Sequence, residues 1–213
     1  MTGSTTMTND RMWRAVAAER ASLVELLETL SESDWNHSSL CEGWRVRDVV
    51  AHLVLSANPG LAWILVNVLR ARGNFDRAIR ETAIRLADRA TSTQLLAALR
   101  DGMTLRATPI GTTAADRLMD LLVHGQDIAV PLGINRPMPV DAARSALERI
   151  WETNGFRARE LSRYRLIDTD TGWTVGTGPL VEGPAASLLL LITGRRAGRE
   201  HLTGEGVPRL NLR

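Results

Sequence analysis

Four side chains on one predicted helix could do chemistry. The stretch Asp116–Val130 (DRLMDLLVHGQDIAV) has the apolar period of an amphipathic helix, and it carries Asp116, Asp120, His124 and Asp127. Asp120 and His124 are four residues apart, so their side chains project from one face of the helix, one turn apart. A carboxylate oxygen and a neutral imidazole nitrogen suit a divalent first-row metal. The pair therefore predicts part of a metal site.

A third ligand must come from another part of the chain, and His52 is the candidate. It lies late in the predicted helix 45–57 (RVRDVVAHLVLSA), among Val49, Val50 and Leu53, where its imidazole would face or border a helical core. Two nitrogens and one oxygen would leave one position open for water or substrate, as catalytic zinc sites require.

Neighbouring carboxylates could support these ligands. Asp48 precedes His52 by one turn and Asp127 follows His124 by three residues, so either could accept the imidazole N–H that does not face the metal. Spacing alone nevertheless favours a simpler interpretation, because an Asp-x-x-x-His pair has many accidental matches. The acidic residues could form a solvated face paired with Arg117, and the two histidines could be satisfied core residues.

Helices must position these side chains, and the pattern of apolar residues predicts helices along the first 130 residues. The predicted helical segments are 8–30, 45–57, 61–70, 77–90, 94–103 and 116–130. No convincing strand interrupts them, so a helical bundle is expected there.

The remainder of the chain has a different pattern. A helix is expected over 140–161, followed by a hairpin in RYRLIDTDTGWTVGTG around an Asp-Thr-Gly turn. An apolar helix that stops at Gly194 and a short last strand in VPRLNLR complete a small α+β segment. Two domains are therefore predicted, a bundle over 8–139 and a C-terminal appendage over 140–213.

Composition limits the kinds of partner. The 213 residues include 26 basic and 24 acidic side chains that are interspersed, which gives no stripe for nucleic acid. The most apolar runs, 61–69 and 187–194, are shorter than the roughly 18 to 20 residues that a bilayer span needs. One cysteine, Cys41, and a polar N-terminus without an export signal favour the cytoplasm. Cys41 is predicted to pack beside Trp44 and not to act as a nucleophile.

Two stretches resemble a known family. The segments 40–53 (LCEGWRVRDVVAHL) and 124–133 (HGQDIAVPLG) are similar to the mycothiol-dependent maleylpyruvate isomerases, part of the DinB-like superfamily. The resemblance implies a mainly α, DinB-like four-helix bundle that binds a metal and mycothiol, with a small C-terminal α+β appendage. It also implies metal ligands at His52, Asp120 and His124, although the family commonly has Glu where this chain has Asp120.

The resemblance further implies an enzyme and its chemistry. Mycothiol, a low-molecular-weight thiol, would be the co-substrate, and a divalent metal, expected to be zinc, would deprotonate it beside a small electrophile. Addition to a conjugated alkene, bond rotation and release of the thiolate would make the protein a cis-trans isomerase. Release of the adduct would make it a thiol transferase, and the metal ligands do not distinguish the two reactions.

Three arginines are candidates for substrate contacts. Arg195, after the apolar helix, is the candidate catalytic residue that would hold a carboxylate of the electrophile. It could equally complement the C-terminus of that helix. Arg45 and Arg47, at the start of the His52 helix, could meet acidic or hydroxyl groups of the thiol cofactor.

Two functions from other classes stay open at this point. One is a non-catalytic helical binding or regulatory module of the same fold. The other is a metal-dependent hydrolase in which a metal-bound water attacks the substrate. The apolar helices could also bury the face of a homodimer, but the sequence does not locate one.

Overall fold

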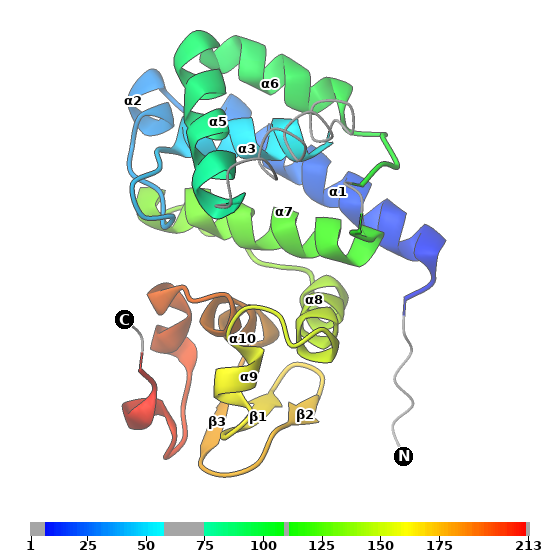
Figure 1. Ribbon diagram of the computed structural model, residues 1–213, viewed down its shortest axis with the longest axis vertical. Coiled ribbons are helices and arrows are strands. Elements are labelled where there is room, and N and C mark those ends of the chain that lie inside the picture. The colour runs from blue at the N-terminus through cyan, green and yellow to red at the C-terminus, as the bar shows by residue number, and fades with distance from the viewer. Residues whose placement is uncertain (1–6, 58–74, 109–110, 212–213) are drawn as a thin grey trace. The chain divides into compact units, whose positions relative to one another are not determined.

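The computed structural model describes residues 7–57, 75–108 and 111–211. The chain divides into two compact units, Thr8–Arg136 and Pro137–Arg213. The first unit is helical, and the second combines helices with a small sheet (Figure 1). The helix predicted over 61–70 lies outside the described residues.

Local capping signals begin most helices of the first unit. Its elements are α1 (Asn9–Glu28), α2 (Glu32–Trp35), α3 (Val46–Ala57), α5 (Phe75–Arg89), α6 (Ser92–Asp101), α7 (Ala114–Ala129) and the 3₁₀ turn η1 (Val130–Leu132). Thr8 caps α1, and Thr91 and Thr113 form capping boxes with Gln94 and Asp116. The carboxylate of Asp116 is therefore part of the start of α7.

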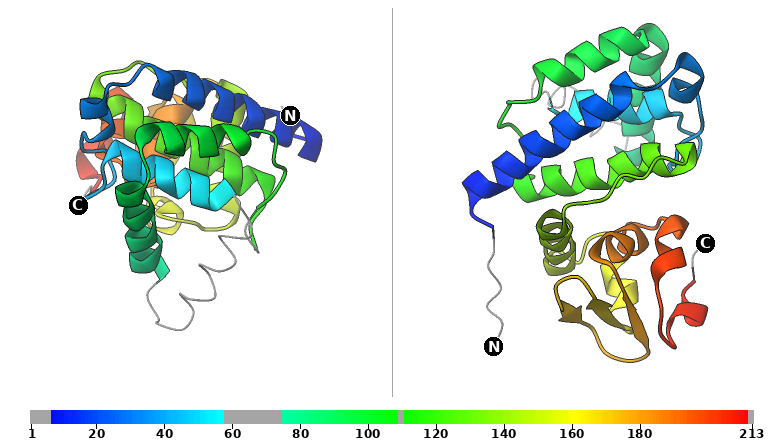
Figure 2. Two further views of the ribbon diagram at one scale, coloured as in Figure 1. Left: turned by 90° about the horizontal axis from the view of Figure 1, so that it is seen from above. Right: turned by 180° about the vertical axis from the view of Figure 1, so that it is seen from behind.

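Four helices of this unit form a bundle. α1 and α3 each contact both α6 and α7, and α5 packs on α3 (Figure 2). Buried side chains of the four helices include Val16, Leu23, Leu27, Val49, Val50, Leu53, Leu95, Leu99, Leu118 and Leu122. Burial of each such side chain contributes about 1.5–3 kcal/mol. Apolar packing thus holds α3 and α7, the two helices that carry the predicted metal ligands.

Arg20 of α1 satisfies the backbone at the end of α6. Its side chain is almost fully buried, and its Nη1 donates to the carbonyl oxygens of Gly102 (2.9 Å), Met103 (3.3 Å) and Leu105 (2.8 Å). Carbonyls at and beyond a helix C-terminus lack partners within the helix. Burial and the charge of Arg117 lower the pKa of Arg20 to about 10, so it remains charged at neutral pH.

The second unit is built around a three-stranded sheet. Its elements are α8 (Val140–Glu152), α9 (Ala158–Leu161), β1 (Arg165–Asp168), β2 (Thr174–Val175), β3 (Leu180–Gly183), α10 (Ala185–Ile192), η2 (Arg196–His201) and η3 (Val207–Arg209). β1 lies between β2, which is antiparallel to it, and β3, which is parallel. Leu166 stands opposite Val175 and Val181, and α10 packs against α8 and the sheet. The predicted hairpin and apolar helix are both present.

Two predictions for this unit are wrong. The helix expected over 140–161 is interrupted after α8, because Asn154 and Phe156 have φ of 50° and 51° and the N–H of Gly155 bonds back to Ile150 O (2.9 Å). The strand expected near the C-terminus is the 3₁₀ turn η3. The third strand, β3, had no prediction.

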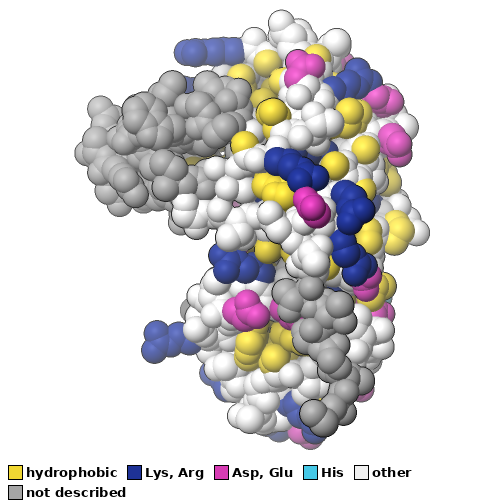
Figure 3. Space-filling model, turned by 90° about the vertical axis from the view of Figure 1, so that its right-hand side faces the viewer, with side chains coloured by type: hydrophobic (Ala, Val, Ile, Leu, Met, Phe, Trp, Pro, Cys, Tyr) yellow, Lys and Arg dark blue, Asp and Glu magenta, His cyan; other side chains and the backbone are white. Residues whose placement is uncertain are grey.

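Surface and helix composition agree with the mixed charge of the sequence. On the face shown in Figure 3, arginine side chains are interspersed with acidic and hydrophobic ones. Among the described residues, no helix combines the length and the apolar content that a membrane span needs.

Candidate metal centre

His52 of α3 and Asp120 and His124 of α7 converge in the bundle. Oδ1 of Asp120 lies 3.4 Å from Nε2 of His52 and 3.4 Å from Nε2 of His124. One ligand atom from each residue lies within 4.8 Å of the other two. The side chains of His52, Asp120 and His124 are 16%, 23% and 13% exposed. The cluster is therefore mostly buried but open to solvent on one side.

These separations fit a divalent metal ion. Ligand atoms about 2.1 Å from a tetrahedral metal stand about 3.4 Å from one another. Both histidine–aspartate separations have this value, which is at the long end of the range for hydrogen bonds. Two imidazoles and one carboxylate are also a ligand set found in catalytic zinc sites. The structure therefore brings together the three predicted ligands in a way that suits the ion.

Two neighbours orient the carboxylate of Asp120. Nη1 of the buried Arg117 donates to Oδ2 of Asp120 (3.0 Å) and to Oγ of Ser56 (2.6 Å). The hydroxyl of Ser56 is in turn 3.4 Å from the same Oδ2. These contacts hold Oδ2, so Oδ1 is the oxygen presented to both histidines. The short arm of Asp120 is thus long enough to reach both histidines.

Asp127 fixes the ring of His124. Its carboxylate is fully buried, and its Oδ2 lies 2.8 Å from Nδ1 of His124. An ionised carboxylate can only accept, so the proton belongs on Nδ1 and the lone pair of Nε2 is directed to the cluster. The contact predicted between Asp127 and His124 is thus present, and its role in metal binding stays a prediction.

Charges in the cluster shift two pKa values in opposite directions. Burial raises the pKa of Asp120, but the adjacent His52 and His124 outweigh it and hold this pKa well below its usual value. Burial lowers the pKa of His124, but hydrogen bonds with Asp120, Asp127 and Cys41 hold it well above its usual value. The two shifts have the same cause, because each favours a charged His124 beside an ionised Asp120.

The turn Cys41–Trp44 brings two further side chains to the cluster. The N–H of Trp44 donates to the carbonyl of Cys41 (3.0 Å), and Gly43 has φ of 70°, which favours glycine. The thiol of Cys41 donates to Oδ2 of Asp127, with Sγ and Oδ2 3.0 Å apart. Its Sγ also lies 3.8 Å from Nδ1 of His124. Cys41 was predicted only to pack beside Trp44, so this contact was missed.

Trp44 forms a wall of the cluster. Its ring centroid is 5.6 Å from that of His52 and 6.4 Å from that of His124, and it is nearly parallel to the latter, with 15° between the planes. The sequence predicts for Trp44 only a packing contact with Cys41 and no place at the metal cluster. The signal that could have placed it here is the Cys-x-Gly-Trp spacing, since a turn with glycine at its third position brings its first and last residues together.

A second group of potential ligands shares one histidine with the first. Ligand atoms of Cys41, His124 and Asp127 also lie within 4.8 Å of one another. Hydrogen bonds of 3.0 Å and 2.8 Å to Asp127 already account for this group without an ion. In the group His52, Asp120 and His124, the two histidine–aspartate separations are 3.4 Å, which matches the spacing of ligand atoms around a metal. This group is therefore the better candidate for a metal site.

Arg45 is held by two carboxylates outside the metal cluster. Its Nε and Nη2 donate to Oδ2 (3.0 Å) and Oδ1 (2.8 Å) of Asp48, and Nη2 also donates to Asp88 (2.6 Å). These hydrogen bonds raise the pKa of Arg45 above its ordinary value. Among the described residues, the hydrogen bonds of the buried Asp48 are all to Arg45, so its predicted support of His52 is not observed.

The other two predicted arginines have different surroundings. Nη1 of Arg47 donates to Oδ1 of Asn36 (3.1 Å) and Nη2 to the carbonyl of Ala90 (2.9 Å), so its guanidinium joins the ends of α2 and α5. Arg195 belongs to the second unit, where its Nη1 donates to the carbonyl of Thr193 (2.7 Å). A ligand-binding role for Arg47 or Arg195 stays a prediction.

The first unit matches a known family. Residues 16–109 match the model of the mycothiol maleylpyruvate isomerase N-terminal domain. This segment, which is less than half of the chain, is similar to that domain. The resemblance predicted from the two motifs is thereby confirmed, as is the expectation of an enzyme family. The matched segment contains His52 and ends before Asp120 and His124.

Two crystal structures have a similar fold. One is that of the mycothiol-dependent maleylpyruvate isomerase, at 15% identity, and the other is that of a histidine-to-alanine mutant of it, at 14%. Each match covers 96% of this chain and 96% of the other, with a TM-score of 0.66. The predicted fold, a mainly helical DinB-like bundle with a small C-terminal α+β part, is confirmed. No curated protein sequence matches the chain.

Proposed function

We propose that this chain is a mycothiol-dependent isomerase that uses a divalent metal, expected to be zinc, bound by His52, Asp120 and His124. The observation that carries the proposal is the convergence of these three ligand atoms, with Asp120 and His124 each oriented by a further partner. A bound ion would supply a Lewis acid that keeps the sulfur of the co-substrate as a thiolate at neutral pH.

Residues around the cluster prepare it for that role. Asp127 holds one proton of His124 on Nδ1, so a cation would bind at Nε2 and displace only the proton there. Arg117 and Ser56 hold one oxygen of Asp120, so the other oxygen meets the cation. Because these partners already fix both side chains, little reorganisation is needed when the ion and the thiol arrive.

The electrophile is proposed from the family name. Maleylpyruvate is a cis alkene conjugated to a carbonyl group, so a thiolate can add to it and the electron pair of the alkene moves onto the carbonyl. Rotation about the resulting single bond and departure of the thiolate restore the alkene in the trans form, with no net change of atoms. If the adduct instead takes up a proton and leaves, the same residues serve a thiol transferase.

Arg195 remains the candidate for holding a carboxylate of the electrophile, since a guanidinium forms paired hydrogen bonds with carboxylates. This role predicts that Arg195→Gln raises KM for a dicarboxylate and leaves the metal content unchanged. An unchanged KM would remove Arg195 from the site.

Metal analysis of the purified protein tests the ligand assignment. The native chain is expected to hold about one zinc ion, and His52→Ala and His124→Ala are expected to lose it. His201→Ala is the matched control, because His201 is an exposed histidine of the second unit. Zinc that persists in both ligand variants would remove the assignment.

Assays with maleylpyruvate and related alkenes then test the reaction. The trans isomer is expected only when both the metal and mycothiol are present. Turnover without a thiol would favour the hydrolase. A zinc-loaded protein that converts no electrophile with mycothiol would favour the binding module.

A further inference from the structure

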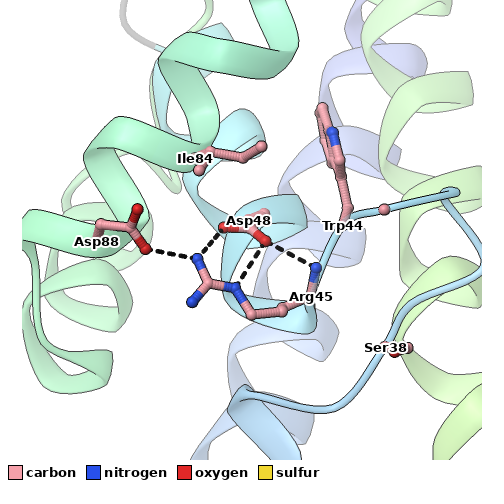
Figure 4. A pocket seen from close by; sticks show the side chains of 7 residues that line it. Ser38, Trp44, Arg45, Asp48, Ile84 and Asp88 are labelled. Carbon is pink, nitrogen blue, oxygen red and sulfur yellow. Dashed lines mark hydrogen bonds and ion pairs between the residues drawn. The ribbon is translucent and has the colours of Figure 1, made fainter.

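A cavity lies beside the candidate metal centre. Its volume is about 460 Å³, and its lining includes Ser38, Trp44, Arg45, Asp48, Ile84 and Asp88 (Figure 4). This size is within the roughly 300–1,000 Å³ of small-molecule sites. Trp44 belongs to both places, because it lines the cavity and its ring centroid is 5.6 Å from that of His52. The cavity and the candidate metal ligands are therefore neighbours on the two sides of one residue.

The charges of the lining, taken together with the neighbouring Arg80, are balanced. Arg45 lies between Asp48 and Asp88, one from α3 and one from α5, and binds both (Figure 4). Arg80 adds a second positive charge where its Nη2 donates to the carbonyl of Gly43 (3.4 Å). Two cations and two carboxylates leave no excess charge for an anion, and each carboxylate would repel one. The cavity therefore favours an uncharged ligand over the acidic group considered for Arg45 from the sequence.

Unused hydrogen-bonding atoms remain in this lining. Among the described residues, Nη1 of Arg45 donates no hydrogen bond and Oδ2 of Asp88 accepts none. The side chain of Asp88 is 55% exposed, so this oxygen is accessible. A donor and an acceptor side by side match hydroxyl groups, because each hydroxyl both donates and accepts. The indole of Trp44 adds an apolar surface against which the carbon face of a ring can pack.

We propose that this cavity binds the hydroxyl-rich, uncharged part of the thiol co-substrate. The inference rests on the proposed function, in which the sulfur of the same molecule reaches His52, Asp120 and His124. For mycothiol, the sugar and cyclitol rings would occupy the cavity, with hydroxyls on Arg45 and Asp88 and a ring face on Trp44.

Calorimetric titration of the zinc-loaded protein with two thiols tests the inference. Mycothiol carries the two rings, whereas N-acetylcysteine keeps the thiol and lacks them. Native protein is expected to bind mycothiol more tightly. Asp88→Asn is expected to weaken mycothiol binding by about tenfold, the scale of one hydrogen bond to a charged group. Binding of N-acetylcysteine should not change.

Glu81→Gln is the matched control on the same helix. Glu81 is an exposed carboxylate of α5 that pairs with Arg77 and does not line the cavity. It should change the affinity for neither thiol. Zinc content measured on the same samples shows whether any loss of binding comes from the metal centre.

The outcomes separate this inference from the proposed function. If Asp88→Asn weakens both thiols equally, or weakens neither, the cavity does not bind the rings, while thiol dependence still stands. If zinc-loaded native protein binds neither thiol, the proposed function fails and the assignment of the cavity fails with it.

Discussion

Nδ1 of His124 and Oδ2 of Asp127 are 2.8 Å apart, on residues three positions apart in α7. The carboxylate is fully buried, and the thiol of Cys41 donates to the same oxygen. A buried charge is tolerated only when donors surround it. His124 is therefore the last member of a hydrogen-bonded series that runs from Cys41, in a loop, through Asp127 to His124 in the bundle.

Replacing Asp127 with Asn should weaken zinc binding by about 10–100-fold, the usual effect of removing a partner of a ligand histidine. The amide lacks the charge that keeps the proton on Nδ1 of His124. Competition with a chromophoric chelator measures the affinity. Asp101→Asn, at an exposed position at the end of α6, is the control. Equal affinity in the two variants would exclude this role for Asp127.

Cys41→Ser should keep its zinc, because serine can still donate to Asp127 and the thiol is not one of the proposed ligands. His52→Ala should lose it. Elemental analysis of both variants separates the two groups of potential ligands described above. The reverse pattern, with zinc lost from Cys41→Ser and kept in His52→Ala, would assign the ion to Cys41, His124 and Asp127.

Arg117→Met should lower zinc affinity by about tenfold, as expected when the partner of a ligand carboxylate is lost. Asp120 would then be free to turn, because Arg117 donates to both Asp120 and Ser56. Stability of the metal-free protein should change less, since removal of this buried charge also relieves its repulsion with Arg20. Chelator competition and thermal unfolding measure the two effects, and an unchanged zinc affinity would contradict the argument.

Zinc affinity should fall as the pH is lowered. Burial lowers the pKa of His124, but its hydrogen bonds, first of all to Asp120 and Asp127, raise it well above the ordinary value. Below that raised pKa the ion must displace a proton, which weakens binding by about tenfold per pH unit. Chelator competition from about pH 8 to about pH 6 measures this slope. Asp127→Asn should shift the dependence to lower pH, and a flat profile would show that no proton is displaced.

Part of the candidate metal cluster could be predicted from sequence because it depends on short-range geometry. Asp120 and His124 meet since a helix places residues four apart on one face. His52 followed from its motif and from its place in an apolar helix. The same local rules predicted the starts of α1 and α6, where Thr8 and Thr91 cap the first turn.

Contacts between distant parts of the chain could not be predicted in this way. Cys41 and Asp127 are 86 residues apart, and no spacing rule connects a loop thiol with a helix carboxylate. The prediction for Asp48 is wrong for a different reason, because the sequence offers it two possible partners, His52 and Arg45. Its carboxylate bonds back to the backbone N–H of Arg45 (2.7 Å), as acids at the third position of a helix commonly do. The guanidinium of Arg45 also donates to both carboxylate oxygens of Asp48, so Asp48 pairs with Arg45 in place of His52.

The apolar core of the bundle has a consequence for how the protein would acquire its ion. α3 and α7 carry His52, Asp120 and His124, and buried leucines and valines pack both helices into the bundle without using these three side chains. Zinc fingers, by contrast, fold only when their metal binds. An ion in this bundle would be loaded into an already folded chain and could be exchanged there for a competitor. The metal found in the cell would then reflect supply and relative affinity after folding, and not the moment of synthesis.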